Sequence, residues 1–563
     1  MFIFILQIRN MLDEQAELYL FAVFSALVWA LWLLKVVLSR RYRPWTAEHH
    51  ESTSVIVPVV DEPLDLFRDV LSRVTEQHPD EVIVVINGKP NPGLEAVCEE
   101  FAPLVRWVHT PIPGKRNAVK IGTEQSRYDV TVLLDSDTVW TPGTLPELLK
   151  PFADPTVGGA TTRQRILEPT RSWITRWADW LENSRSLYSM PAQSVLGQVG
   201  CLPGRTIAFR RHILMQVMDD FMTQRFLGVF LEVSDDRTLT NLTLKQGYRT
   251  VYQHTSLVYT DAPLQVKKLF KQQLRWARGS QYNTLRMLPW MLGHAPLLAV
   301  FFLTDIALPF LLVGTIAGWV YRAVSGTGTN LYQAILETYG AQAGWFWVIA
   351  LMVTSSVLSM SIRQIRHLQE VPGDFFRLPV FIIVSTFFLM PVRLLGFLRM
   401  AHASGWGTRA GAYAGGDPGT EPEQTAADPD GGQSASLLRE LDLISRPAPV
   451  DVVDRDPVTG WFPMQRSGSG QPAAAVPAGL RAAGATEEAA GARAAGIEPA
   501  RAAVASAEAA GAEQAAATAD RPAGRRAART SAAPVRRRRL NPLAAIPYLV
   551  AVALLTLEAL LYV

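Results

Sequence analysis

Long apolar runs constrain the fold of this chain more than any other feature. A membrane-spanning helix needs about 20 predominantly apolar residues. The chain offers four candidate runs, at residues 18–38, Leu297–Val320, Trp345–Met360 and Pro542–Val563. A fifth apolar run, Leu378–Met400, contains Pro391, Arg393 and Arg399. We therefore predict an integral membrane protein, and 563 residues are enough for several domains.

Basic residues beside these runs predict which side of the membrane each segment faces. Three arginines within residues 40–43 follow the first run, which we expect to be an anchor and not a signal peptide. The positive-inside rule places the segment after it in the cytoplasm, together with Arg363 and the cluster Arg536–Arg539. An anionic-lipid contact of that cluster would point to the same side. An even number of crossings must then separate the last two sites, so we predict that Leu378–Met400 is re-entrant or interfacial and broken at Pro391.

Composition excludes several other classes of protein. The formal net charge is only +3, which argues against a dedicated nucleic-acid binder. The only cysteines, Cys98 and Cys201, exclude a disulfide scaffold, suit a reducing compartment and lack zinc-ligand spacing. Residues 410–534 are rich in Ala, Gly, Pro and Arg, and we predict that they are mostly disordered. Within them, Ser436–Ile444 and Val458–Met464 are candidate docking elements.

Between residues 54 and 282 the pattern becomes that of a globular α/β domain. Short β-branched runs alternate with amphipathic stretches, and the helix that Pro63 opens has apolar residues at helical spacing. This alternation predicts a parallel sheet with ligand sites beyond the carboxyl ends of its strands. No GxGxxG follows the first strand, which disfavours a dinucleotide-binding domain. The predicted strands are Ser54–Val60, Glu81–Ile86, Val105–Val108 and Val130–Leu134.

The fourth predicted strand is followed at once by Asp135, Ser136 and Asp137. Aspartates at i and i+2 point the same way along an extended chain, and Mg²⁺ or Mn²⁺ prefers oxygen ligands shared with a phosphate. A capped strand end is the alternative, because Asp and Ser are common in turns. Taken alone, the tripeptide leaves a metal site and a turn equally open.

Other motifs surround this tripeptide in a recognisable order. SVIVPVVDEP and the sequence Gly114–Arg116 precede it, and the quartet Ser234–Arg237 follows it, with Glu232 close by. QQLRW at Gln272–Trp276 and WGTR at Trp406–Arg409 come next. This order resembles the membrane-embedded family 2 processive glycosyltransferases, most of all the hyaluronan synthases and their chitin- and cellulose-synthase relatives. The resemblance extends over about residues 15–409.

The resemblance implies a fold, an activity and a cellular location. The fold is a cytoplasmic α/β nucleotide-diphosphosugar transferase domain, GT-A-like with a Rossmann-like parallel sheet, inserted between transmembrane helices of a multi-pass cell-membrane protein. The activity is that of a metal-dependent, inverting hexosyltransferase, which polymerises sugars from UDP-sugar donors into an extracellular polysaccharide and translocates it. The expected cofactor is Mg²⁺ or Mn²⁺. The expected partners are the nucleotide-sugar donor, the growing polysaccharide and the lipid bilayer, with no nucleic acid.

The apolar runs, the composition and the resemblance together predict a division of the chain into five parts. We expect residues 1–45 to be an N-terminal transmembrane anchor and 50–285 the transferase domain. Residues 290–409 are expected to hold transmembrane helices, the re-entrant or interfacial segment and a gating loop. Residues 410–540 are expected to be a disordered cytoplasmic linker, and 541–563 a last transmembrane helix.

A sugar donor of this class carries a diphosphate that leaves as an anion, so a metal and fixed cations are needed where the charge develops. By resemblance, Asp137 is the first choice of metal ligand, and Asp135 assists through metal or ribose contacts. Lys115 comes just before a predicted helix and is expected to contact the diphosphate; a solvated Lys–Arg pair is the alternative. The expected donor-binding residues are Asp61, Asn87, Lys115, Arg116, Asp135, Gln272, Arg275, Trp406, Thr408 and Arg409.

In inverting transfer a carboxylate takes the proton from the attacking acceptor hydroxyl. By resemblance, Asp236 is the base, Asp235 its supporting neighbour, and Arg237 orients either carboxylate. The structural alternative, Asp235 as a helix N-cap, is compatible with these roles. Trp276 is expected under the acceptor sugar, whose C–H face suits an aromatic plane, although membrane anchoring is the alternative for a lone Trp. The other expected acceptor contacts are Cys201, Pro203 and Gly204.

Several residues depart from the family pattern. Val59 and Val60 replace the usual aromatic residue and Asn after the first strand, Asn87 replaces Asp after the second, and Ser234 replaces Gly in the acidic quartet. These departures bear on recognition of the donor base and sugar more than on the chemistry. The aromatic stretch Ser172–Tyr188 has helical spacing, and we predict a packed or interfacial helix rather than a sugar-gripping one.

Two other functions are compatible with parts of the pattern. One is a family 2 transferase that adds a single sugar to a lipid-linked acceptor and translocates nothing. The other is a catalytically inactive transport or scaffold subunit, which would predict lost carboxylates, yet Asp135, Asp137, Asp235 and Asp236 are all present.

Overall fold

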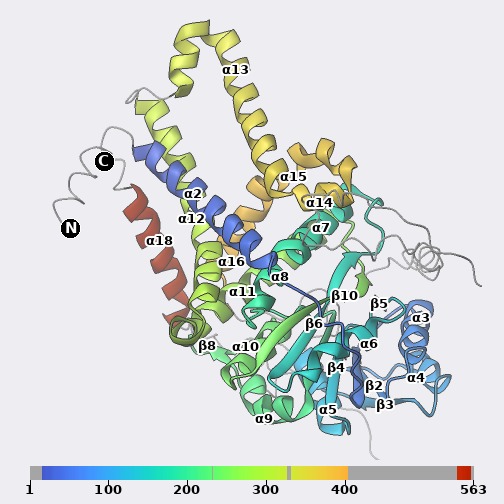
Figure 1. Cartoon of the computed structure of the whole chain (residues 1–563). Helices are drawn as coiled ribbons and strands as arrows, with labels where there is room; N and C mark the ends of the chain where they lie inside the picture. Colours follow the sequence, from blue (N-terminus) through green and yellow to red (C-terminus); the bar gives the residue numbers. More distant parts are fainter. Residues whose placement is uncertain (1–15, 231–232, 326–330, 403–541, 560–563) are drawn as a thin grey trace, which may run out of the picture. The chain divides into compact units, whose positions relative to one another are not determined.

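A mixed eight-stranded sheet with the order β3-β2-β1-β4-β7-β6-β10-β5 organises the globular part of the chain (Figure 1). The computed structural model describes residues 16–230, 233–325, 331–402 and 542–559. The strands of the sheet are β1 (Thr53–Val59), β2 (Glu81–Asn87), β3 (Val105–Thr110), β4 (Val130–Leu134), β5 (Thr138–Trp140), β6 (Val157–Ile166), β7 (Thr206–Arg210) and β10 (Arg249–Thr260). A separate pair is formed by β8 (Arg225–Phe226) and β9 (Val229–Phe230).

The first four strands of the sheet are parallel, as the alternation of strands and helices predicts. β1 pairs with β2 on one side and β4 on the other, and β2 pairs with β3. The helices between them are α3 (Leu64–Thr75), α4 (Pro92–Glu99) and α5 (Lys115–Gln125). All four predicted strands are confirmed, with ends that differ by two residues at most.

The other half of the sheet corrects the expectation of a wholly parallel arrangement. β7 runs antiparallel to both β4 and β6, and β5 runs antiparallel to β10. Only Asp135–Asp137 separate β4 from β5, whereas a parallel crossover needs about a dozen residues or more. The acidic tripeptide is therefore a sharp link between two strands of one sheet.

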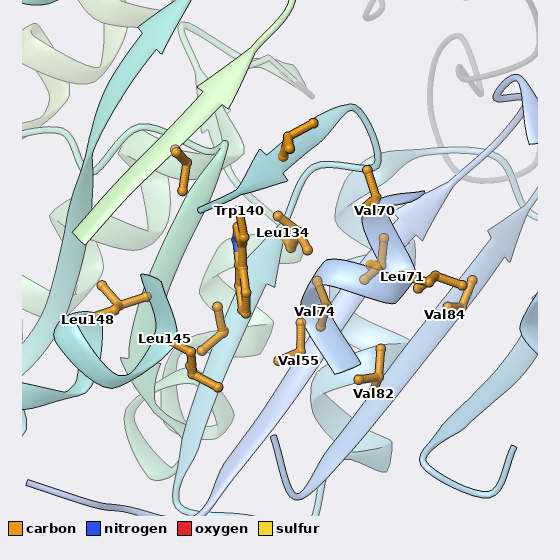
Figure 2. Packing of buried hydrophobic residues seen from close by; sticks show 14 of the residues in the cluster. Val55, Val70, Leu71, Val74, Val82, Val84, Leu134, Trp140, Leu145 and Leu148 are labelled. Atoms are coloured by element: carbon orange, nitrogen blue, oxygen red, sulfur yellow. The ribbon is translucent and has the colours of Figure 1, made fainter. Parts of the chain in front are cut away.

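Apolar side chains from α3 and the parallel strands form the core on one face of the sheet. Val70 and Val74 of α3 face Val55 and Val82, and Trp140 of β5 lies against Leu134 (Figure 2). These side chains are at most 1% exposed, and burying a side chain of this size stabilises a fold by about 1.5–3 kcal/mol. This packing fixes the strand ends that carry the polar motifs.

The remaining helices of the globular part complete the domain. They are α6 (Thr144–Leu149), α7 (Trp173–Ser184), α8 (Met190–Val195), α9 (Arg211–Met222), α10 (Asp235–Lys245) and α11 (Val266–His294). α7 continues through a π-helical turn, Arg185–Ser189, into α8. The predicted helix over Ser172–Tyr188 is thus confirmed.

Two of the tryptophans of α7 are buried in packing contacts. Trp177 and Trp180 are at most 4% exposed, and the Trp180 ring stacks on Phe381 with 5.1 Å between centroids. The Arg176 Nε donates to Asp374 at 2.8 Å. α7 is therefore a packed helix that joins the globular domain to the apolar segment after residue 371.

Five described helices are long and apolar enough to cross a membrane. They contain the windows Ala22–Ser39, Pro296–Gly318, Gln342–Arg363, Pro372–Leu398 and Pro542–Ala559. The helices are α2 (Ala16–Ser39), α12 (Pro296–Ser325), α13 (Leu331–Arg363), the segment after residue 371, and α18 (Ile546–Ala559) behind a short 3₁₀ turn. α13 is interrupted at Gly340, and α14 (Ile365–Glu370) follows it. The four predicted runs all form helices.

The predicted break at Pro391 is wrong. α15 (Leu378–Val384), a π-helical turn at Ser385–Leu389 and α16 (Met390–Leu398) follow one another without interruption. Pro391 lies in the first turn of α16, where the missing N–H is tolerated and the wider π turn accommodates the ring. Whether this helix crosses the membrane or is re-entrant stays a prediction.

Candidate active site

Lys115 brings three distant motifs together. It is the first residue of α5, after Gly114, whose φ of 131° is a conformation that glycine favours. Its Nζ lies 2.5 Å from Oδ1 of Asp135 and 3.2 Å from Oδ2 of Asp235. Burial alone would lower the pKa of Lys115, but the charges of the two aspartates raise it well above its usual range. The amine therefore stays charged between two carboxylates.

Asp236, the predicted base, is the second residue of α10 and is held by four groups. Its Oδ2 accepts the Gly204 N–H at 3.3 Å and lies 3.8 Å from the Cys201 Sγ. Its Oδ1 accepts the Ser234 hydroxyl at 3.2 Å and the backbone N–H of the next residue at 2.7 Å. The carboxylate is thus fixed in position beside the loop that holds Cys201 and Gly204.

The two neighbouring aspartates have opposite electrostatic environments. Burial and the charge of Asp235 raise the pKa of Asp236 above its usual value. Burial acts in the same sense on Asp235, but Lys115 and Arg116 outweigh it and lower the pKa of that carboxyl. Paired carboxyls whose pKa values are pushed apart divide into an ionised partner and a proton-exchanging one. Of this pair, Asp236 is the carboxyl that holds a proton more readily.

Ser234 occupies the N-cap position of α10, without a capping hydrogen bond from its side chain, and its conformation bears on one departure from the family pattern. Its φ is 65°, in the left-handed region where glycine is usual and other residues are strained. Gly279 of α11 makes room for it, because a methyl group at Gly279 would lie 2.6 Å from the Ser234 Cβ. Ser234, and not Asp235, is the N-cap residue, so the predicted capping role of Asp235 is wrong by one position.

Arg116 does not face the site, and the prediction that it contacts the donor is wrong. Its guanidinium is 1% exposed and donates to the Phe221 carbonyl at 2.7 Å and to Thr238 at 3.3 Å. It also lies 4.8 Å from the centre of the Phe221 ring. Arg116 therefore ties α5 to α9 and α10.

Arg237 is also a packing residue, which corrects its predicted contact with the aspartates. Its guanidinium donates to the hydroxyls of Ser280 and Thr284 on α11, the latter at 2.7 Å. It lies 3.9 Å from the centre of the Phe302 ring on α12. Only the backbone N–H of Arg237 reaches Asp236.

The predicted acceptor residues lie beside the aspartates. Gly204 borders the same pocket as Lys115, and a methyl group there would lie 3.5 Å from the Lys115 Nζ. The loop is held in place because the Arg205 carbonyl accepts the Asp135 N–H at 3.1 Å. The full lining of the pocket is Pro58, Lys115, Leu133, Leu134, Asp135, Gly204, Ile207, Asp235 and Asp236.

The predicted donor-side residues occupy the carboxyl ends of β1 and β2. Asp61 is exposed just after β1. Asn87, the last residue of β2, is 2% exposed, and its Oδ1 has no hydrogen-bond partner among the described residues. Between them, the buried Glu62 accepts the Ser136 hydroxyl at 2.7 Å, which connects the loop after β1 to the acidic tripeptide.

Asp261 is a candidate that sequence reasoning missed. It follows β10 directly, and Thr260 pairs with Thr138, so Asp261 comes opposite Asp137. Burial and the charge of Asp137 raise the pKa of Asp261 from 3.8 to about 6. An aspartate at the end of a β-branched run was the available signal, since Asp135 follows β4 in the same way.

The QQLRW motif lies on α11, which packs on α16. Trp276 is 38% exposed, and Gln272 and Arg275 are partly exposed. The Arg278 Nε donates to the Arg399 carbonyl at 2.9 Å, next to the close contact of Gly396 with α11. The helix that carries the motif is therefore bonded to the end of α16. Trp406, Thr408 and Arg409 lie outside the described residues, as does Glu232.

The chain is similar in sequence to a glycosyltransferase family model and to two named enzymes. A family model described as glycosyltransferase like family 2 matches residues 50–279. A hyaluronan synthase of Streptococcus pyogenes is 27% identical over 424 residues, which cover 72% of this chain and 96% of that protein. An N-acetylglucosaminyltransferase of Mesorhizobium japonicum is 29% identical over 381 residues, 66% of this chain and 84% of that protein.

The chain also matches a solved structure. It is a mannosyltransferase from Pyrobaculum calidifontis in complex with GDP-Man and Mn²⁺, 18% identical, with a TM-score of 0.49. The match covers 69% of this chain and 99% of that one. The family match over residues 50–279 contains all described site residues from Asp61 to Trp276.

Proposed function

Because residues 50–279 form a family 2 glycosyltransferase domain, we propose that the chain is a processive, inverting synthase. It transfers sugar from a UDP-linked donor to a growing polysaccharide and passes the polymer through its own membrane helices. The observation that carries the proposal is the position of Asp236, between Gly204 of the acceptor loop and Asp235, which is paired with Lys115. This position supports the proposal, because a carboxylate that could take a proton lies beside a lysine that could contact the donor diphosphate.

Charge at the site supports a divalent cation. Asp135, Asp137, Asp235 and Asp236 bring four carboxylates to one sheet end, and Lys115 is the cation paired with two of them. An anionic donor could not approach such a site without more positive charge. Among the described residues, no group of three or more His, Cys, Asp and Glu side chains is close enough to hold a metal by itself. We therefore propose Mg²⁺ or Mn²⁺ ligated in part by the donor's own phosphate oxygens.

Asp135 and Asp137 have different proposed roles. By the order of motifs, we propose Asp137 as the metal ligand, and Asp135, which lies 2.5 Å from Lys115, as the residue that orients Lys115. A bound dication would stabilise the charge on the departing diphosphate. Lys115 and Arg275 supply further positive charge on the protein side.

Proton transfer is the task of Asp236. As the acceptor oxygen forms its bond to the anomeric carbon and the bond to the diphosphate breaks, an Asp236 oxygen takes the hydroxyl proton. The Gly204 N–H and the Ser234 hydroxyl keep the carboxylate oriented. A raised pKa is what such a base requires, because it must accept a proton near neutral pH.

Membrane helices next to the site support the translocating version. α11, which carries Trp276, packs on α16 through Ala277 and Gly396, and Arg237 packs on Phe302 of α12. The acceptor end of the site therefore adjoins helices that are long enough to cross a bilayer. The domain division at residues 45–50, 285–290, 409–410 and 540–541 and a cytoplasmic transferase domain belong to the same proposal.

Incubation of membranes with each labelled UDP-sugar, singly and in pairs, tests the polymerase activity. The proposal expects long products that linkage-specific hydrolases digest. A product that requires two donors together would indicate a hyaluronan-like polymer, and one donor sufficing would indicate a chitin- or cellulose-like polymer. If purified protein and donor give only lipid-linked single sugars, the second candidate function, single transfer to a lipid acceptor, replaces this one.

Asp236→Asn separates an enzyme from an inactive subunit. It preserves shape but removes the base, and general-base catalysis contributes about 10²–10⁴-fold. We expect polymer output in membranes to fall by that order. Unchanged output would leave only the scaffold function, with the bond-forming chemistry supplied by another protein.

A further inference from the structure

Arg205, which follows the predicted acceptor residues Pro203 and Gly204 but was not itself predicted, stands beside the exposed ring of Trp276. The Arg205 guanidinium carbon lies 5.9 Å from the centre of that ring. Arg205 directly follows Gly204, whose N–H donates to Asp236, and its own carbonyl accepts the Asp135 N–H at 3.1 Å. Arg205 is therefore fixed between the aromatic ring and the carboxylates of the site.

Two buried side chains hold one end of the Arg205 guanidinium. Its Nη1 donates to Oε1 of Gln164 on β6 at 2.8 Å and lies 3.2 Å from Oε1 of Glu182 on α7. Gln164 is 2% exposed and also donates to the Pro203 carbonyl at 3.3 Å. These contacts restrict the rotation of a side chain that would otherwise have many conformers.

The other end of the guanidinium is available. Nε and Nη2 of Arg205 have no hydrogen-bond partner in the part of the chain that the structure describes, and the side chain is 13% exposed. A guanidinium presents five N–H donors in a rigid planar fork. The donors left over match the hydroxyl oxygens of a sugar, or its carboxylate if the sugar is acidic.

We propose that Arg205 is an acceptor-binding residue. Its Nε and Nη2 hydrogens bind oxygens of the acceptor sugar that lies on Trp276, while Glu182 and Gln164 act as positioning residues for Arg205. The proposal rests on the proposed function, because it takes Trp276 as the platform for the acceptor. Arg205 would supply hydrogen-bond donors beside the Trp276 ring. Its substitution should weaken binding of the acceptor and leave binding of the donor unchanged.

An ion pair between β6 and α7, the two elements that carry Gln164 and Glu182, provides a matched control. Arg165 of β6 donates to Asp179 of α7 through Nε at 2.8 Å and Nη2 at 2.9 Å. Asp179 is 1% exposed and lies one helical turn before Glu182. Asp179→Asn therefore breaks a buried pair that joins the same strand and helix without contacting Arg205.

The experiment compares wild type, Arg205→Gln, Glu182→Gln and Asp179→Asn in the full chain in detergent or nanodiscs. The probes are two β-linked tetrasaccharides, one with a neutral and one with a uronic acid non-reducing end. Equilibrium binding of each probe is measured with donor absent, and donor hydrolysis is measured with acceptor absent. We expect Arg205→Gln to weaken probe binding by about 10–100-fold, as the loss of charged hydrogen bonds implies, with the KM for donor hydrolysis unchanged.

The remaining outcomes decide between the alternatives. Glu182→Gln should weaken binding in the same direction but less, and Asp179→Asn should leave it unchanged; equal losses in all three variants would overturn the proposal. So would unchanged probe binding by folded Arg205→Gln, or no binding of either probe to wild type. A larger loss for the uronic probe identifies a carboxylate as the group bound, and an equal loss identifies hydroxyls. Probe binding without polymer formation would overturn only the processive function.

Discussion

Asp261 stands opposite Asp137 across the sheet, because Thr260 of β10 pairs with Thr138 of β5. Two carboxylates therefore meet where β5 begins and β10 ends, and the charge of Arg171 opposes the smaller effect of Glu168 on Asp261. This relationship makes the metal-free protein sensitive to pH at this point.

Asp261→Asn should stabilise the metal-free protein at pH 7 more than at pH 5. Burial and Asp137 raise the pKa of Asp261 from 3.8 to about 6, so the folded state holds this proton more tightly than the unfolded chain does. Stability from Asp261 is therefore present at low pH and lost as pH rises through about 6. We expect the melting temperature at pH 7 to rise by about 2–4 °C per kcal/mol recovered.

Asp154→Asn is the control with the opposite sign. Hydrogen bonds from Thr156 and the charge of Arg249 lower the pKa of Asp154, although burial opposes them. Its removal should lower the melting temperature at pH 7 or leave it unchanged. If both variants shift the temperature equally at both pH values, the raised pKa of Asp261 is not the cause.

Lys115 and Arg116 are neighbours with different expected effects. Lys115→Met removes the cation that contacts Asp135 and Asp235, so transfer should fall by about 10²-fold or more while the protein stays folded. Arg116→Lys should lower the melting temperature, because a lysine cannot replace hydrogen bonds to several buried acceptors. Activity per folded Arg116→Lys molecule should change little. An inactive but stable Arg116→Lys protein would return Arg116 to the donor site.

The rate of sugar transfer should rise with pH through the pKa of Asp236 and level off above it, because the base acts when deprotonated. The charge of Asp235 contributes to the raised pKa of Asp236. Asp235→Asn should therefore move the acidic limb of the profile to lower pH, alongside any loss of rate. Asp261→Asn serves as the comparison. If the acidic limb of the pH profile moves only in that variant, the limb reports the protonation of Asp261 and not that of Asp236. Rates are measured at saturating donor over a pH series that begins well below neutrality, so that both the acidic limb and the plateau are recorded.

Ser234→Gly should gain about 1 kcal/mol of stability, because Ser234 has a positive φ that costs a residue with a Cβ about that much. The loss of its hydrogen bond to Asp236 at 3.2 Å reduces that gain. Gly279→Ala should be strongly destabilising in the wild type, since its methyl group would lie 2.6 Å from the Ser234 Cβ. In the double variant the destabilisation should be smaller, which a comparison of the four melting temperatures checks.

The local patterns of the sequence predicted the elements and much of the site. Helical runs near α2, α12, α13 and α18 follow from apolar length alone, and the four parallel strands follow from β-branched runs between turn residues. The order of motifs carries a family resemblance that assigned Asp135, Asp137 and Asp236 to one site, and each of these motifs is a short run of residues. These features depend on residues close in the chain, so their signal is present in the sequence.

Contacts between distant residues could be decided only by the tertiary structure. Arg116 directly follows Lys115 and Arg237 directly follows Asp236, so both look like site residues by position. Each guanidinium instead donates to groups of neighbouring helices. Asp261 and Arg205 reach the site through strand pairing and through Glu182 and Gln164, which no motif links to them. Sequence thus determined which chemical groups the chain carries and on which elements. The fold decided which of them face the reaction, because side-chain direction and pairing register are set by packing among residues far apart in the chain.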